Sequence, residues 1–258
     1  MDNNRSVKEL RAIARDQLVG KYGIAVPAVL LIAGVQGLAL LLSESGASGG
    51  TVSSYLLRYV ISLIIDLLTG ILMYGRSFFF LKIARVEENP SARDVFYGFK
   101  NNTDKAVLLQ LPYTGLSLLC TIPAVCINLG ILPAPKNYLM ASMGLLLLQI
   151  LVLSVAKLFI GLSFFILCDS PELSVPEILA KSTRLMSKRK GRLIIVCLSM
   201  LPLMILSIFG LFIGLLWYEA YFRTLLADFY LESKGEEPGN PIKTPESRVD
   251  GYSTSDIH

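Results

Sequence analysis

Long apolar runs separated by short basic segments are the feature that most constrains the fold of this chain. Residues 24–42 contain no charged side chain, and a helix of that length is close to what a hydrocarbon core of about 30 Å requires. Over all 258 residues, 53% are hydrophobic and only 17% are charged. Soluble domains of this size carry more charge than that. We therefore expect an all-α, polytopic membrane protein.

Six transmembrane helices are predicted from the apolar runs, at residues 24–42, 55–81, 106–129, 138–168, 193–208 and 212–230. The last two belong to one apolar stretch, which as a single helix would measure about 58 Å. We therefore place a hairpin at Gly210 and Gly214. A five-span arrangement is the main alternative, because this hairpin lacks a polar turn. A second, weaker alternative is that the first apolar run belongs to a cleaved signal peptide. The basic amphipathic segment before that run does not resemble the start of a signal peptide.

The distribution of Lys and Arg predicts the orientation. The segments outside the six runs carry, in chain order, five, none, five, one, six, none and three Lys or Arg residues. Because basic segments stay on the cytosolic side, we expect a cell (cytoplasmic) membrane protein with both termini in the cytosol. An integral membrane domain of residues 1–231 is predicted, followed by a disordered cytosolic tail, 232–258, rich in Gly, Pro, Ser and charge.

Three capping boxes recur along the chain, 85 and 83 residues apart. In each, a serine is followed three residues later by an acidic residue, the pattern that begins a helix; the serines are Ser6, Ser91 and Ser174. The helices that follow are basic and amphipathic, as surface helices are. We expect three cytosolic amphipathic helices. Each precedes one outward and one inward run, which indicates a possible threefold internal repeat.

Asp66, Lys157 and Glu219 are the ionisable residues closest to the middle of the predicted spans. Each would cost about 2.5 to 3.5 kcal/mol if left alone in lipid, so they should face the bundle or water. Asp66 and Lys157 are predicted at similar depths, where they form either a structural pair or a relay for protons or solutes. Glu219 has a local partner, Arg223, one helical turn on.

The segment before the fifth run offers candidate contacts to anionic lipids. Each Lys or Arg beside an anionic membrane surface gains about 1 kcal/mol. The alternative is that the same charges only set the topology. The residues are Lys181, Arg184, Lys188, Arg189, Lys190 and Arg192.

Several classes of function are disfavoured by what the sequence lacks. The single histidine is His258, and no G-x-S-x-G, H-E-x-x-H or P-loop motif occurs. The four cysteines sit alone in apolar runs, without the spacing of metal ligands. The net charge of +4 lies in short blocks, which does not favour nucleic acid as a partner. We expect no catalytic, cofactor or metal site.

Several motifs resemble the bacterial integral-membrane domain-of-unknown-function family nine-seven-five. They are Lys157 late in an apolar run, L-x-D-x-P-E at 167–172, S-x-x-x-M at 182–186, the basic stretch 188–192, the glycine-bearing hairpin 210–217 and A-x-F-Y at 227–230. Weaker similarity lies at 83–85 and 96–100. The usual I-P-G before the lysine is replaced by residues 153–156. The resemblance implies a multi-pass bacterial membrane protein and no established activity.

The sequence therefore predicts a non-enzymatic component of the membrane or envelope. The lipid bilayer is its expected partner, and protein partners are left open. A small-solute or ion transporter or channel that uses Asp66 and Lys157 is the alternative, and a membrane-bound enzyme comes third.

Overall fold

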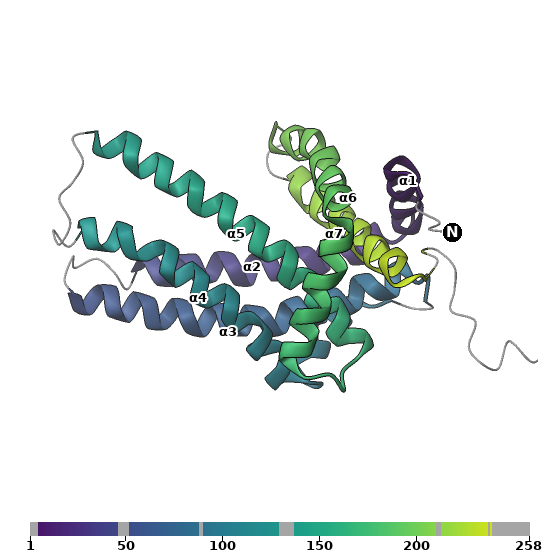
Figure 1. Ribbon diagram of the computed structural model, residues 1–258, viewed down its shortest axis with the longest axis horizontal. Helices are drawn as coiled ribbons and strands as arrows, with labels where there is room; N and C mark the ends of the chain where they lie inside the picture. The colour runs from purple at the N-terminus through teal and green to yellow at the C-terminus, as the bar shows by residue number, and fades with distance from the viewer. Residues whose placement is uncertain are drawn as a thin grey trace, which may run out of the picture.

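The computed structural model describes residues 5–45, 52–87, 90–128, 137–209, 213–236 and 238. Within these ranges every regular element is a helix, which confirms the all-α prediction. The elements are α1 (Val7–Leu18), α2 (Tyr22–Ser45), α3 (Val52–Ala84), the 3-10 helix η1 (Ala92–Phe99), α4 (Thr103–Asn128), α5 (Tyr138–Asp169), α6 (Val175–Phe209) and α7 (Ile213–Lys234). Helices α2 to α5 run along the long axis of the molecule, and α1 and α7 gather at one end, which we call the α1 end (Figure 1).

Three helices are long and apolar enough to cross a membrane: Leu56–Ala84 of α3, Thr103–Ile127 of α4 and Ser142–Asp169 of α5. Two more candidates are bent pairs, namely α1 with α2 and the two halves of α6. The described residues thus contain three to five candidate spans, which indicates a membrane protein. The six predicted spans are not confirmed.

The predicted capping boxes at Ser6 and Ser91 are present, and at Ser174 the structure shows the contact to the Glu177 carboxylate. The Ser6 hydroxyl accepts a hydrogen bond from the Glu9 backbone N–H at 3.2 Å, and the Glu9 carboxylate accepts one from the Ser6 N–H at 2.8 Å. Ser91 begins η1 in the same way, and the Ser174 N–H donates to the Glu177 carboxylate at 2.9 Å. Each box therefore fixes the first residue of a short helix, although the second helix is 3-10 rather than α.

Two sharp bends separate short amphipathic helices from apolar ones. Helix α1 meets α2 at 97°, and the break contains Gly20 at φ +79°, a left-handed conformation that favours glycine. The first half of α6 (Val175–Ser187) meets its second half (Gly191–Ser207) at 79°, at the non-helical residue Arg189. These angles suit a helix that lies along a membrane surface beside one that enters the membrane.

The second half of α6 and α7 pack against each other where the sequence predicts the fifth and sixth spans. The facing ends of these helices stop well short of the left-hand ends of α2 to α5 (Figure 1). Helix α7 contacts α1, because the Tyr221 hydroxyl donates to the Arg11 carbonyl at 2.9 Å. Helix α7 is not among the candidate spans. The physical reason lies in its charged residues, among them Glu219, Arg223 and Asp228, which interrupt the apolar sequence.

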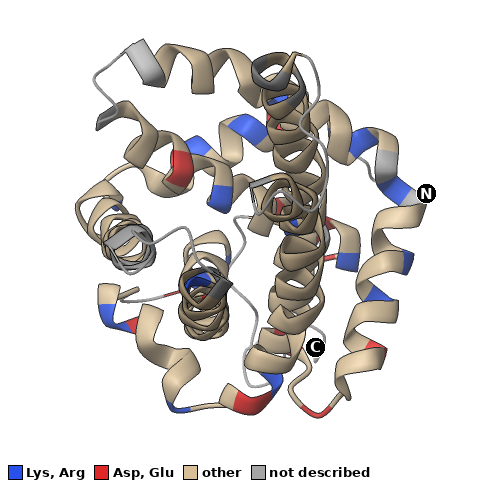
Figure 2. Cartoon of the chain, turned by 90° about the vertical axis from the view of Figure 1, so that its left-hand side faces the viewer, with Lys and Arg blue, Asp and Glu red and all other residues tan. Residues whose placement is uncertain are grey.

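The core lies at the α1 end of the long helices. Buried side chains gather in the corresponding halves of α3, α5 and α7 and include Tyr74, Phe79, Phe164, Phe229 and Tyr230. The other halves expose large apolar side chains, among them Leu57, Leu119, Met140, Leu147 and Leu151. Figure 2 looks from that far end and shows the nearest helices almost entirely tan, with most charged residues on segments behind or beside them. Such apolar surfaces suit contact with lipid.

Glycines allow η1 to pack backbone-to-backbone against α3. A Cβ atom on Gly75 would overlap the carbonyl oxygen of Val95, and one on Gly98 would overlap that of Ile71. Because both obstacles are main-chain atoms, a side chain at either position forces the two elements apart. Helix α3 is therefore held directly against the segment that connects it to α4.

The predicted boundary of the tail falls inside α7. Glu232 lies in that helix and is only 7% exposed, and the helix continues to Lys234. It continues because charged residues after Leu231 have ion-pair partners that hydropathy does not reveal. Residues 239–258 of the predicted tail lie outside the described part of the chain.

Candidate functional site

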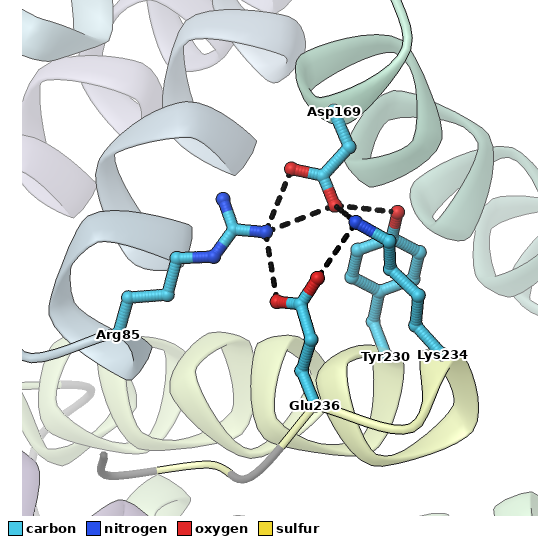
Figure 3. A network of polar contacts seen from close by, with 5 residues as sticks. All are labelled: Arg85, Asp169, Tyr230, Lys234 and Glu236. Atoms are coloured by element: carbon cyan, nitrogen blue, oxygen red, sulfur yellow. Dashed lines mark hydrogen bonds and ion pairs between the residues drawn. The ribbon is translucent and has the colours of Figure 1, made fainter. Parts of the chain in front are cut away.

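A network of ion pairs joins the ends of α3, α5 and α7 (Figure 3). At its centre the Asp169 carboxylate, only 5% exposed, lies 2.8 Å from the Arg85 guanidinium and 3.0 Å from the Lys234 ammonium. The Tyr230 hydroxyl donates to the same carboxylate at 2.9 Å. Glu236 closes the ring, at 3.0 Å from Arg85 and 2.7 Å from Lys234. Three helices far apart in sequence are thereby tied together.

The charges within this network balance. Arg85 and Lys234 supply two positive charges, and Asp169 and Glu236 supply two negative ones. Burial lowers the pKa of Arg85, but the two carboxylates outweigh burial and hold that pKa above its usual value. Burial also lowers the pKa of Lys234, and its contacts with the same two carboxylates outweigh that effect and raise the pKa. Both cations therefore stay charged near neutral pH and keep their ion pairs with the two carboxylates.

Sequence reasoning did not predict this network, although one signal pointed to it. Three of its five members lie in segments that carried the family resemblance: Arg85 in residues 83–85, Asp169 in 167–172 and Tyr230 in 227–230. Arg85 and Asp169 are 84 residues apart, and Asp169 and Tyr230 are 61 apart. No periodicity connects residues at such separations, so the pairing required the fold.

A second set of contacts fastens α1 to α7. The Gln17 side-chain amide donates to the Asp228 carboxylate at 2.9 Å. Nearer the chain start, the Arg5 backbone N–H donates to Glu232 at 3.0 Å, and the Arg192 guanidinium lies 2.7 Å from the same carboxylate. Arg192 was predicted as a lipid contact. In the structure its side chain is 15% exposed and is engaged in this ion pair.

The other five predicted lipid contacts differ in their exposure. Lys181 and Arg184 are exposed on the first half of α6, and Arg189 at the bend is half-buried. The side chains of Lys188 and Lys190 lie outside the described part of the structure. The structure thus shows two exposed cations of this set on one helix.

A deeper ion-pair cluster joins α3 to α7. The Glu219 carboxylate lies 2.7 Å from the Arg223 guanidinium, as predicted from their spacing, and 3.2 Å from that of Arg76. Arg76 lies in the predicted run 55–81, is 8% exposed and points to Glu219. A carboxylate within reach makes that pairing more favourable than an extended path to the surface.

Asp66 and Lys157 are brought near one another without direct contact. The two charges interact electrostatically, yet no ion pair joins them within the described part of the chain. The Lys157 ammonium instead lies 5.5 Å from the centre of the Tyr113 ring, a cation–π arrangement. Glu219 belongs to the separate cluster with Arg76, so the three predicted residues do not form one site.

A small cavity lies between these groups. Its volume is about 20 Å³, and its lining includes Arg76, Lys157 and Arg223 together with Gln110. The Gln110 side-chain oxygen has no hydrogen-bond partner among the described residues. A water molecule needs roughly 10 to 15 Å³ measured in this way, so the cavity has room for about one. No group of three or more His, Cys, Asp or Glu in the described ranges is placed to hold a metal ion.

Comparison with known proteins agrees with the resemblance found in the sequence. The model of a family described as "Protein of unknown function (DUF975)" matches residues 1–237, a range that covers all the described helices. Searches among curated proteins and among solved structures gave no match.

Proposed function

Because the chain belongs to this family of unknown function, we propose its role from geometry: a non-enzymatic, multi-pass component of the cell membrane or envelope. The observation that carries the proposal is that three charges of α7 pair with other helices: Glu219 with α3, Lys234 with α5 and Glu232 with α6. Arg76 and Arg223 pair with Glu219, and Asp169 anchors the network at the helix ends. A buried charge committed to an ion pair stabilises one packing of the helices and is not available to a substrate.

We place both termini in the cytosol, with α1, η1 and the first half of α6 as cytosolic surface helices. Each of these helices precedes two apolar helices, which is the basis for a threefold repeat. The six-span arrangement puts the turn between α6 and α7 outside the cell. The contact between α7 and α1 favours a hairpin that enters and leaves the membrane on the cytosolic side, with four full crossings by α2 to α5.

A cysteine introduced at Gly210, in a background free of other cysteines, distinguishes these arrangements. A membrane-impermeant maleimide added to intact cells labels Gly210→Cys if the turn is outside. We expect no labelling from outside, and labelling of a control, Ala47→Cys, in the loop between the first two apolar runs. Labelling of both cysteines would support the six-span arrangement. With six crossings or with four, the number is even, so both termini stay cytosolic.

Transport is the second candidate, favoured by one observation. Three cationic side chains and Gln110 line the small cavity, and Asp66 lies within electrostatic reach of Lys157. A relay through this region would move a small anion or protons across the bundle. The alternative predicts flux in proteoliposomes that Asp66→Asn abolishes.

The test of the main proposal uses the same proteoliposomes. We expect no protein-dependent flux of protons or chloride, and we expect specific proteins to co-purify with the full chain after gentle solubilisation. A flux that Asp66→Asn abolishes, and that the surface control Asp16→Asn leaves intact, would replace the structural role with transport.

Contact of α6 with anionic lipid is also part of the proposal. Lys181 and Arg184 are exposed on its first half, where headgroup phosphates can reach them. Replacing both by Gln should weaken the association of the purified protein with anionic lipids. If the association is unchanged, these charges only set the topology and do not bind anionic lipid.

A further inference from the structure

A groove at the α1 end has a basic wall and an apolar wall. Its volume is about 710 Å³, and it lies between α1, the start of α2 and the α6–α7 hairpin. Lys8, Arg11 and Arg15 line the α1 side. Their spacing of three and four residues places them on one face of the helix. We call this feature the α1 groove; it lies apart from the ion-pair networks and from the first half of α6.

The positive charge of the α1 groove is only partly neutralised. Arg15 pairs with its neighbour Asp16 at 3.3 Å, in an exposed ion pair. In the described part of the chain, neither the Lys8 ammonium nor the Arg11 guanidinium forms an ion pair, and the groove lining contains no carboxylate. An anion that enters the groove therefore meets two cations without competition from an acidic side chain.

The facing wall suits a hydrocarbon chain. Leu203 and Leu206 of α6 and Trp217 of α7 line it. Leu206 is 68% exposed and Trp217 is 46% exposed, so these apolar surfaces are not covered by the rest of the described chain. Tyr221, which also lines the groove, holds the two walls together through its hydrogen bond to the Arg11 carbonyl.

We propose that the α1 groove binds one anionic phospholipid, with its phosphate on Lys8 and Arg11 and an acyl chain along Leu206 and Trp217. The basic wall selects a negative headgroup, because each Lys or Arg favours an anionic lipid over a neutral one. The apolar wall selects an amphipathic ligand over a free anion such as inorganic phosphate. Tryptophan is favoured at this boundary between headgroups and acyl chains.

Trp217 is the only tryptophan in the chain, so its fluorescence reports on the groove directly. The full-length protein is reconstituted in vesicles of phosphatidylcholine with a minor fraction of phosphatidylglycerol. Bromine atoms, which quench tryptophan on contact, are placed on the acyl chains of one lipid at a time. At equal mole fraction of brominated lipid, we expect quenching to indicate about fivefold enrichment of phosphatidylglycerol at Trp217, which corresponds to about 1 kcal/mol.

The variant that tests the basic wall is Lys8→Gln with Arg11→Gln. Its enrichment should fall to about one, while quenching by bulk lipid persists. The matched control, Arg93→Gln with Lys100→Gln, removes two exposed charges from η1 and its C-cap and should keep the enrichment. Soluble glycerol phosphate should not displace the brominated lipid. Any of three results would overturn the proposal. They are equal quenching by both lipids in the wild type, unchanged enrichment in the Lys8/Arg11 variant, and an equal loss of enrichment in the control.

Discussion

Replacing Asp169 by Asn tests whether the network of Figure 3 holds the helices together. The substitution keeps the size of the side chain and removes one negative charge from a set whose four charges sum to zero. It leaves Arg85 and Lys234 sharing the single carboxylate of Glu236. The ends of α3, α5 and α7 then carry an uncompensated positive charge.

The expected loss follows from the burial of the pair. The Asp169 side chain is 5% exposed and that of Arg85 is 13% exposed. Removing one partner of a buried ion pair costs about 3–5 kcal/mol, and because Glu236 remains near both cations we expect about 3 kcal/mol. The matched control is Asp16→Asn, which breaks the pair with Arg15. Those side chains are 68% and 69% exposed, so its cost should stay below about 1 kcal/mol.

Both variants are measured by thermal unfolding in the same detergent, followed by circular dichroism. With about 2–4 °C per kcal/mol for a chain of this size, Asp169→Asn should lower Tm by about 6–12 °C. A double-mutant cycle with Arg85→Met should show coupling, because the double variant no longer buries an unpaired charge. If Asp169→Asn costs no more than Asp16→Asn, or if the cycle is strictly additive, the network does not stabilise the fold.

Two further predictions concern packing and capping. Gly75→Ala should lower stability by about 1–3 kcal/mol, because the new methyl group meets the Val95 carbonyl. The control Gly161→Ala, which meets no atom within 4 Å, should be neutral or stabilising in the same unfolding assay; equal effects would argue against close packing. In the wild type, the backbone N–H of Ser174 lowers the pKa of Glu177 below its ordinary 4.5. A group with a lowered pKa stabilises the fold at pH above its unfolded value, so the wild type should exceed Glu177→Gln in Tm at pH 7. This difference should fade as the pH drops below about 4.5; a difference that persists at pH 3 would exclude the ionised cap as its cause.

The sequence by itself determined where the helices lie. The predicted run 138–168 agrees with α5 (Tyr138–Asp169), and the capping boxes locate the starts of the short helices. Hydropathy and capping act over a few residues, so they can be read without the fold. The ion pair between Glu219 and Arg223 was predictable for the same reason, because one helical turn separates them.

The tertiary structure alone decided which helices meet and where the charges go. Arg76 and Glu219 lie 143 residues apart and Arg5 and Glu232 lie 227 apart, yet each pair is in contact. The same long-range contacts place the α6–α7 hairpin beside α1 and create the α1 groove. A local pattern specifies a helix and its apolar face, whereas the partner of a buried charge depends on the packing of the whole bundle.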